Sequence, residues 1–512
     1  MKWIRKLYKI VFSRLVIVVF LLAVQVIWFL IFLMRLSHYS VGINIFFTIL
    51  SALALLHIIN RKDNPAFKLA WAVPVLMFPL LGGLLYLLFG TRKTQKAFRQ
   101  MIEKSRTRLN PDREQNPEVI RAVEALDGKV AGQMKYLAGV GYPVHEGTQT
   151  EYFPSGEANF PVMVEELKKA EHFIFLEYFI IEEGLMWDTI LDILKEKAAA
   201  GLDVRLLYDD VGSLTMLPYR YYKTIESYGI KCEAFNHFVP FLSVVMNNRD
   251  HRKIMVIDGH TAFTGGINLA DEYINVKKRL GYWKDTGIML KGEAAWNLTV
   301  MFLETWNCVR PTDQDISCFK PHVWHPQEFV SDGYVQPYGD SPLDEETVGE
   351  NVYLNIINMA ERYVYMFTPY LIIDNEMITA LTLAAKRGVD VRIVTPDIPD
   401  KKIVFWMTQS YYAQLAEAGV KIYQFTGGFI HAKCFICDDE IATVGTVNMD
   451  FRSLYLHFEN GVLLYRTKAV LQVKQDAEET IARSTPVTKE MAGRRPLVRL
   501  VQALLRLFAP LM

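Results

Sequence analysis

The sequence predicts an α/β protein made of two tandem copies of one unit, preceded by helices that cross a membrane. Three observations carry this prediction: long apolar runs near the N-terminus, a strand–helix–strand pattern that occurs twice, and a polar motif that ends each copy. The chain has 512 residues, of which 51% are hydrophobic and 22% are charged, so it is not mainly disordered. It has 56 basic and 56 acidic residues, a balance that argues against a general nucleic-acid-binding protein.

The first ninety residues contain three apolar runs, each close to the length that crosses a bilayer as a helix. They are Leu15–Met34, Val41–Ile59 and Leu69–Phe89. A cleaved signal peptide could account for one such run but not for three. The third run carries two prolines and a glycine pair, so a kinked or re-entrant segment is the alternative to a full span there.

The basic residues around these runs leave the membrane topology open. Several precede the first run, which predicts a cytoplasmic N-terminus. Three full spans would place the remainder of the chain outside, yet the basic residues that follow the third run favour the inside. A re-entrant third run would remove this conflict. With either topology we expect a multi-pass membrane protein whose partner is the lipid bilayer.

The two copies of the α/β unit are found by comparing segments almost 190 residues apart. Ala170–Phe175 corresponds to Ala360–Tyr365, where a helix end runs into an aromatic and β-branched strand. Gly201–Leu207 corresponds to Gly388–Val394, where a glycine ends a helix and an alternating pattern begins the next strand. We therefore expect a membrane anchor at 1–92, a helical linker at 93–140, the two units at 141–330 and 331–486, and a terminal helix at 487–512.

Each copy ends in the same polar motif, with histidine, lysine, aspartate and asparagine at identical spacing. The residues are His251, Lys253, Asp258 and Asn268 in the first copy, and His431, Lys433, Asp438 and Asn448 in the second. A histidine and a lysine two residues apart on a strand lie on the same side, and an anion between them would relieve the repulsion of their charges. Two such sets facing each other predict one phosphate or phosphodiester site that needs no metal ion or cofactor.

Four carboxylates near the motifs have different expected roles. Asp258 and Asp438 follow four apolar residues, so from their position we interpret them as structural groups at the far end of the strand. Asp285 and Glu459 come after the motifs and are candidates to orient the imidazoles, as the acid of a catalytic triad does. Ordinary surface carboxylates are the alternative for this second pair.

The duplicated motif resembles that of the phospholipase D superfamily. The apolar runs, the stretch Arg61–Pro65, the continuation Asn448–Ser453 and the basic tail are similar to the bacterial cardiolipin synthases within it. The resemblance extends over about residues 60–512 and implies two tandem phospholipase D-like α/β sandwich units that share one active site. The chain departs from the family in two respects. Its first apolar run is additional to the usual two spans, and its second motif has Gly-Thr where the first has Gly-Gly.

The resemblance also implies an activity: phosphatidyl transfer between two phosphatidylglycerol molecules, giving cardiolipin and glycerol through a phosphohistidine. His251 would be the nucleophile and His431 the acid/base, with the opposite assignment as the main alternative. By family analogy Lys253, Lys433, Asn268 and Asn448 would bind the phosphate, and Asp258 and Asp438 complete the catalytic motif. A phospholipase D-type hydrolase or another phosphatidyltransferase is the alternative enzyme, and a lipid-binding protein without activity is the alternative outside catalysis.

Aromatic residues suggest a route for lipid chains. Tyr178, Phe179, Tyr370, Phe429 and the apolar stretch 238–246 are candidates to line it. Core or rim packing is the alternative for most of them.

The net charge of zero hides a segregation of charge along the chain. Residues 1–110 carry a net charge of +14 and residues 489–512 carry +4, whereas residues 111–488 carry −18. In the last twenty residues, leucines fall at helical spacing opposite arginines, which predicts a basic amphipathic helix. Such a helix lies on anionic lipid or packs on the protein itself, and the sequence leaves both open. We expect the bacterial plasma membrane as the location and no nucleic-acid partner, with the oligomeric state open.

Overall fold

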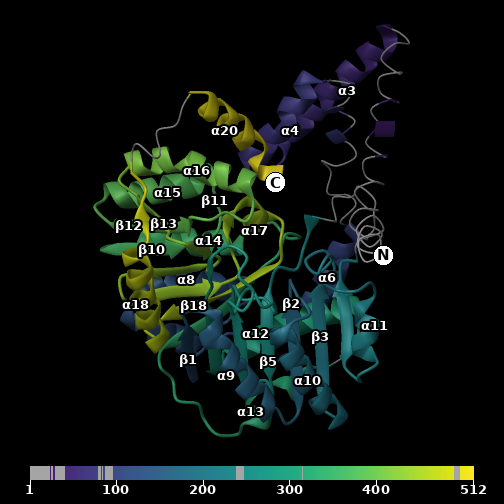
Figure 1. Ribbon diagram of the computed structural model, residues 1–512, viewed down its shortest axis with the longest axis vertical. Coiled ribbons are helices and arrows are strands. Elements are labelled where there is room, and N and C mark those ends of the chain that lie inside the picture. The colour runs from purple at the N-terminus through teal and green to yellow at the C-terminus, as the bar shows by residue number, and fades with distance from the viewer. Residues whose placement is uncertain are drawn as a thin grey trace, which may run out of the picture.

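A computed structural model describes residues 41–78, 96–237, 247–313, 315–488 and 496–511, together with a few separate positions between 24 and 86. Figure 1 shows two α/β units, with the N-terminal helices projecting from one end. Each unit is a mixed sheet whose strands run in the same relative order, so the predicted duplication is confirmed. The apolar run Leu15–Met34 falls mostly outside the described residues.

The N-terminal part of the structure consists of α3 (Val41–Asn60) and α4 (Pro65–Met77). Among the helices that the structure describes, none combines the length and the apolar character needed to span a membrane. Beyond α4 the chain turns back on itself, because Gly82 lies against Pro74 while Tyr86, farther along the chain, stacks edge-on against Trp71 at 5.6 Å. The described part of the third apolar run therefore doubles back, and its re-entrance into a membrane stays a prediction.

A helical linker joins this region to the first unit. Its first helix packs against α12 (Ala295–Val309), which is buried along nearly its whole length. The side chain of Asp127 accepts hydrogen bonds from Lys129 and Val130 and so caps the last helix of the linker. The linker elements are α6 (Lys96–Leu109), η2 (Asn110–Arg113), α7 (Pro117–Leu126) and α8 (Gly128–Gly139).

The first unit is a seven-stranded sheet in the order β1-β8-β6-β5-β2-β3-β4. Alternate side chains of its strands enter two different apolar clusters, one beneath α9, α10 and α11 and one shared with α12 and the second unit. The elements are β1 (Thr148–Phe153), α9 (Gly156–Lys169), β2 (Phe173–Tyr178), α10 (Leu185–Ala199), β3 (Asp203–Asp209), α11 (Tyr221–Glu226), β4 (Lys231–Phe235), β5 (Lys253–Ile257), β6 (Thr261–Gly265) and β8 (Gly287–Gly292).

The second unit repeats this plan with one added edge strand, in the order β19-β13-β12-β10-β15-β16-β18-β9. Its strands β10, β12 and β13 are parallel, as β2, β3 and β4 are in the first unit. The elements are β9 (Tyr334–Asp340), α14 (Val348–Met359), β10 (Tyr363–Phe367), α15 (Asn375–Lys386), β12 (Asp390–Pro396), α16 (Lys402–Glu417), β13 (Lys421–Phe425), β15 (Cys434–Cys437), β16 (Ile441–Gly445), β18 (Glu459–Tyr465), α18 (Lys468–Ala482) and β19 (Thr485–Pro486).

Short elements connect the two units and complete the chain. The strands β7 (Tyr282–Lys284) of the first unit and β14 (Gly428–Ile430) of the second pair in parallel. Asp250 of the first unit also forms a β-bridge with Phe458 of the second. The two halves are therefore interlocked rather than simply adjacent. The remaining elements are η4 (Ser317–Phe319), α13 (Pro321–Trp324), β11 (Leu371–Ile372), β17 (Met449–Asp450), α17 (Phe451–Tyr455), α20 (Pro496–Phe508) and η5 (Ala509–Leu511).

Candidate active site

The two motif histidines lie at the boundary between the units, His251 two residues before β5 and His431 three residues before β15. The backbone N–H of His251 donates to the carbonyl of Phe458 at 2.9 Å, and that of His431 donates to the carbonyl of Lys284 at 2.7 Å. Both imidazoles are 7% exposed. Each histidine is therefore positioned by the chain of the opposite unit.

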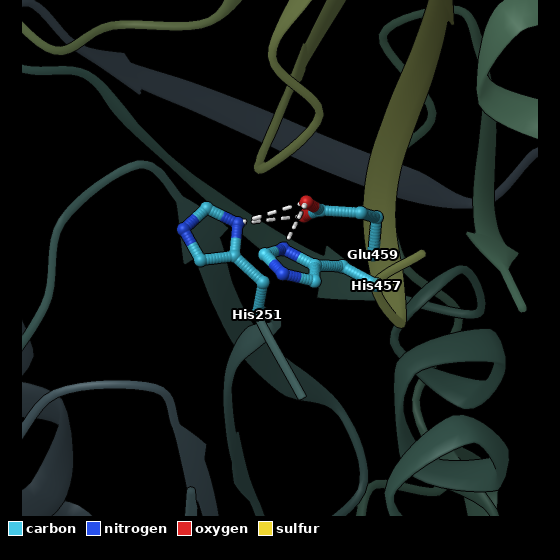
Figure 2. Close-up of side chains that lie close together, drawn as sticks. All are labelled: His251, His457 and Glu459. Carbon is cyan, nitrogen blue, oxygen red and sulfur yellow. Dashed lines mark hydrogen bonds and ion pairs between the residues drawn. The ribbon is translucent and has the colours of Figure 1, made fainter. Parts of the chain in front are cut away.

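The orienting carboxylates cross between the units in the same way. Nδ1 of His251 lies 2.9 Å from both carboxylate oxygens of Glu459, and Nδ1 of His431 lies 2.6 Å from Oδ2 of Asp285. Both carboxylates are fully buried. Figure 2 shows the imidazole of His251 directed at the Glu459 carboxylate. With Nδ1 held by an acid, Nε2 of each ring is the nitrogen that can meet a substrate.

Burial sets the protonation of the histidines. It lowers the pKa of His251 to about 3, although the neighbouring Glu459 opposes the shift. Burial and the ammonium of Lys433 together lower the pKa of His431 to about 4. Burial alone would raise the pKa of Glu459 and of Asp285, but the facing histidines outweigh it and hold both values below the ordinary range. Both imidazoles are therefore neutral and both acids are ionised at neutral pH.

The two lysines lie beside the histidines, as the spacing predicted. Nζ of Lys253 donates to the carbonyl of His251 at 2.5 Å, and Nζ of Lys433 lies 2.9 and 3.0 Å from the two ring nitrogens of His431. Burial lowers the pKa of Lys253 to about 7 and that of Lys433 to about 8. An anion in the site would favour the charged form of both lysines.

The two asparagines of the motifs differ in their hydrogen bonds. The amide of Asn268 is engaged on both sides, since its oxygen accepts from Ile180 at 3.0 Å and its nitrogen donates to the hydroxyl of Tyr273 at 2.6 Å. Oδ1 of Asn448 is buried and makes no hydrogen bond to any described residue. The ring of Tyr273 is 5.5 Å from that of His431, which places this pair next to the second histidine.

Asp258 and Asp438 lie apart from the site. Each has a positive φ, of 48° and 52° respectively, in the turn that follows its strand. Asp258 accepts three backbone N–H groups at the start of β2, and Asp438 accepts three at the start of β10. A whole strand separates these two aspartates from the histidines and their oxygens are occupied by backbone groups, which supports the structural interpretation. The catalytic role that the family resemblance implies for them stays a prediction.

The Gly-Gly and Gly-Thr difference between the motifs is matched by a difference in the acids. A Cβ on Gly266 would stand 2.0 Å from Oδ1 of Asp285, so only glycine leaves room for that carboxylate. The corresponding residue in the second motif is Thr446, whose hydroxyl donates to Glu459. Glycine thus accompanies the shorter acid, and a hydrogen-bonding threonine accompanies the longer one.

His457 is a residue of this site that sequence reasoning missed. Its ring is 5.6 Å from that of His251, and its Nδ1 lies 3.8 Å from Oε1 of Glu459 (Figure 2). It is 7% exposed, and neither ring nitrogen hydrogen-bonds to the described part of the chain. Its position two residues before Glu459 was the available signal, because residues two apart in an extended segment share a side.

Three donor atoms, from His251, His457 and Glu459, lie within 4.8 Å of one another and could geometrically hold a transition metal. The neighbouring ammonium of Lys253 opposes a cation there, and Glu459 already holds Nδ1 of His251. The donor set therefore fits a pair of polarised imidazoles around one carboxylate better than it fits a metal centre.

The aromatic residues proposed for a lipid route divide into two groups. The ring of Phe179 is 4.9 Å from that of His251, and the ring of Phe429 is 6.0 Å from that of His431, so both flank the site. Tyr178 is buried in the core of the first unit, and Tyr370 donates its hydroxyl to Asp400. Residues 238–246 lie outside the described residues.

Comparison with known proteins places this geometry in a family. A family model described as "Cardiolipin synthase, PLD-like domain" matches residues 163–282 and 353–481, one segment in each unit. A second model, described as "Phospholipase_D-nuclease N-terminal", matches residues 49–90. Both matched segments of the first model include a complete motif strand, β5 or β15.

Whole-chain relatives agree with this match. A cardiolipin synthase of Geobacillus thermodenitrificans is 37% identical over 459 residues, covering 88% of this chain and 90% of that protein. A cardiolipin synthase of Alkalihalophilus pseudofirmus is 34% identical over 490 residues, covering 93% and 95%. An uncharacterized protein of Streptococcus mutans is 44% identical over 461 residues, covering 90% and 99%.

Among solved structures, the phosphatidylserine synthase of Haemophilus influenzae has a similar fold. It aligns with a TM-score of 0.52 at 16% identity, over 71% of this chain and 93% of that one. At this identity the likeness concerns the fold alone, and it agrees with the two α/β units described above. The matched family model and the long alignments with cardiolipin synthases establish that the chain belongs to the bacterial cardiolipin synthase family of the phospholipase D superfamily.

Proposed function

We propose that this protein synthesises cardiolipin by transferring a phosphatidyl group from one phosphatidylglycerol to another, with release of glycerol. The observation that carries the proposal is the pair of crossed histidine–carboxylate contacts, His251 with Glu459 and His431 with Asp285, in a chain of this family. Two imidazoles, each oriented by a buried acid and accompanied by a lysine, suit displacement at phosphorus in two steps.

In the first step Nε2 of His251 attacks the phosphorus of the donor lipid. A nitrogen–phosphorus bond forms, and the bond from phosphorus to the departing glycerol oxygen breaks. His431 gives its proton to that oxygen, so glycerol leaves as a neutral alcohol. The surroundings of His431 within the protein favour its neutral form, and the phosphodiester anion of the substrate supplies the negative charge that favours the protonated form.

In the second step a hydroxyl of the acceptor phosphatidylglycerol replaces glycerol. His431, now neutral, takes the hydroxyl proton, the oxygen bonds to phosphorus, and the nitrogen–phosphorus bond to His251 breaks. Lys253 and Lys433 hold the non-bridging oxygens and balance their charge in both transition states. Asn448 adds an amide donor on the same side, and Asn268 can add one once its contact with Tyr273 opens.

The central test is product analysis with purified full-length protein in mixed micelles. Phosphatidylglycerol labelled in the headgroup should release glycerol and give cardiolipin in equal amounts, and His251→Ala should do neither. Release of phosphatidic acid in place of cardiolipin would make the protein a hydrolase and would contradict the proposal.

The order of the two histidines is tested separately with a donor whose leaving group needs no protonation, such as a phosphatidyl p-nitrophenol. His431→Ala should then accumulate an acid-labile, base-stable phosphoprotein, and His251→Ala should not. The reverse result would exchange the two roles without removing the proposed reaction.

The proposal also places the enzyme in the bacterial plasma membrane as a multi-pass protein, held there by its N-terminal region. The support for this part is the sequence, namely its three apolar runs and the basic residues between them. If the third run is re-entrant, the catalytic units lie on the side of the N-terminus. The domain boundaries given for the sequence stay predictions.

A further inference from the structure

Helix α20 is rotated about its axis so that polar side chains face the protein, which is the reverse of a surface helix in a soluble protein. Its polar side faces the second unit: Gln502 is 6% exposed and donates to the carbonyl of Trp406 at 3.0 Å. The guanidinium of Arg506 lies 3.9 Å from the centre of the Tyr411 ring on α16, which is a cation–π contact. The hydrogen bonds and the cation–π contact fix the rotation of the helix about its axis.

A row of apolar side chains on α20 consequently points away from the protein, while Leu505 packs against the core. Leu500, Leu504 and Phe508 fall at intervals of four residues and are 58%, 56% and 41% exposed. A surface helix in water normally buries such a row and exposes its polar side. Figure 1 shows α20 lying over α16 at the end of the second unit, with the C-terminus beside α4.

Exposed apolar side chains continue from α20 onto its neighbours. On α4, which packs against α20 and η5, Leu76 and Met77 are 62% and 65% exposed. On α16, Ile403 and Trp406 are 51% and 46% exposed. We call the exposed apolar side chains of α4, α16 and α20 the docking face. An apolar surface that extends over three elements is more than scattered surface residues, and surfaces of this kind mark contacts with a partner or a membrane.

The docking face is joined rigidly to the active site through α17. Asn64 caps the N-terminus of α4. Its side-chain amide nitrogen donates to Oδ2 of Asp374 and to the hydroxyl of Tyr455 on α17, both at 2.8 Å. The ring of Phe67 stands edge-on to Phe451 at 5.7 Å and to Tyr455 at 5.5 Å. Because α17 begins three residues after Asn448, the orientation of the docking face fixes that of the second motif.

The charge of the C-terminal segment selects among the possible occupants. Residues 491–512 contain four arginines and no acidic residue, and Arg499 is exposed at the edge of the apolar row. A second copy packed through the same face would bring the exposed Arg499 of each copy close together, whereas anionic headgroups would neutralise it. A helix that lies in a membrane interface buries its apolar side only as far as the headgroup and acyl boundary, which suits one apolar row with an arginine beside it.

We propose that the docking face is buried in the headgroup and acyl boundary of an anionic bilayer, with α20 held between the second unit and the lipid. This contact goes beyond the proposed reaction and does not depend on it for its main test. It would hold the second motif at a fixed height and angle over the membrane that supplies both substrates.

The test uses full-length protein in nanodiscs of phosphatidylglycerol and phosphatidylethanolamine, with nitroxide-labelled lipid as a quencher. The exposed Cys318 is replaced by serine, since the other four cysteines are buried, and a bimane is attached at Leu504→Cys. Leu471→Cys on α18 is the matched control, because Leu471 is 58% exposed and Leu504 is 56% exposed. The bimane at 504 should be strongly quenched by the labelled lipid, and the bimane at 471 should not.

Equal and weak quenching at both positions would overturn the proposal. It would mean that α20 does not contact lipid and is covered by a second copy or by another segment of this chain. A second arm compares Leu504→Glu with Leu471→Glu on phosphatidylglycerol vesicles and on a short-chain, monomeric phosphatidylglycerol. Only Leu504→Glu should lose activity, by about tenfold, and only on vesicles. Loss of activity on both substrates would indicate damage to the fold and would contradict the expected effect. If the wild-type protein made no cardiolipin at all, the proposed reaction would be wrong, but the quenching result would still test the docking face.

Discussion

At the scale of single residues, the site is defined by which acid meets which histidine. Glu459 of the second unit holds His251 of the first, and Asp285 of the first unit holds His431 of the second. Both imidazoles are buried and neutral, and both acids are ionised, so each ring is oriented through Nδ1 and uses Nε2 toward a substrate. At His431 the Nζ of Lys433 also lies 3.0 Å from Nε2. The residue beside each acid, Gly266 or Thr446, is fitted to the length of that acid.

A first prediction follows for Gly266. In Gly266→Ala the new Cβ would meet Oδ1 of Asp285 at 2.0 Å, so the acid must move and His431 loses its orientation. We expect kcat for cardiolipin formation to fall by about 10²-fold. Thr446→Ala removes the hydrogen bond to Glu459 and the hydroxyl's contacts with the backbone of Asn460 but leaves the acid in place, so it should cost less than about tenfold. Equal losses of kcat in the two variants would show that the space beside Asp285 does not determine the orientation of His431.

A second prediction concerns the orienting acids. Asp285→Asn and Glu459→Gln keep the size of each side chain but remove the charge that stabilises an imidazolium, so kcat should fall by about 10²- to 10⁴-fold. Steady-state rates measure this. Asp258→Asn is the control, since its carboxylate binds only backbone N–H groups at β2, and it should lower the thermal stability with little effect on kcat. A large kcat effect for Asp258→Asn would return that residue to the catalytic set.

At the scale of secondary-structure elements, the contact between α4 and the second unit depends on a cluster of buried polar groups. The hydroxyl of Tyr455 lies 2.6 Å from Asp374 and 2.9 Å from both oxygens of Glu350, and Asn64 of the N-terminal segment adds its amide. Burial and the nearby Asp374 raise the pKa of Glu350 to about 8. One carboxyl of the pair is therefore protonated at neutral pH and can share its proton.

This cluster gives a pH prediction. Glu350 loses its proton near 4.5 in the unfolded chain and near 8 in the folded one, so the folded state holds the extra proton between these values. The associated stability is full below about pH 4.5 and is lost as the pH rises toward 8, by about 5 kcal/mol in total at about 1.4 kcal/mol for each pKa unit. Glu350→Gln should remove this part of the pH dependence.

The measurement is the thermal unfolding of wild type and Glu350→Gln in detergent between pH 5 and 9. Because the histidines and lysines of the active site titrate alike in both proteins, the difference between the two curves isolates Glu350. The exposed Glu417→Gln serves as the control and should parallel the wild type. Parallel curves for Glu350→Gln as well would mean that Glu350 is ionised throughout.

At the scale of the whole molecule, the two units form one interlocked body. The shared β7–β14 pair, the Asp250–Phe458 bridge and the two crossed acids each take one partner from either unit. A hydrogen bond from Asn460 to Thr264 at 2.8 Å joins them again between the two motifs. Neither unit contains a complete histidine–acid pair by itself, so the duplicated chain holds a single site.

A single shared site predicts how activity responds to the loss of one histidine. His251→Ala and His431→Ala should each leave less than about one thousandth of the wild-type kcat, because every turnover uses both imidazoles. Two independent sites would instead leave close to half of the activity in each variant. Steady-state rates of cardiolipin formation distinguish these outcomes, with circular dichroism to check that both variants are folded.

The sequence alone determined the parts of this protein that depend on local pattern. The repeat of strand, helix and strand, the spacing of His251 and Lys253, and the helical spacing of leucines in α20 all follow from the order of residues along the chain. These features follow from the periods of strands and helices, which any folded chain must respect. The structural role expected for Asp258 followed in the same way, from counting residues along a strand.

Only the tertiary structure decided which groups meet across the fold. Three contacts are of this kind: Asp285 and Glu459 each bind a histidine of the other unit, His457 lies beside His251, and Gln502 faces the second unit. Each contact joins residues that are far apart in the sequence. Spacing gives the side of a strand or helix on which a residue lies, but not the surface that this side meets. That choice is made by the packing of the whole chain, because burial of apolar surface and satisfaction of polar groups are settled together.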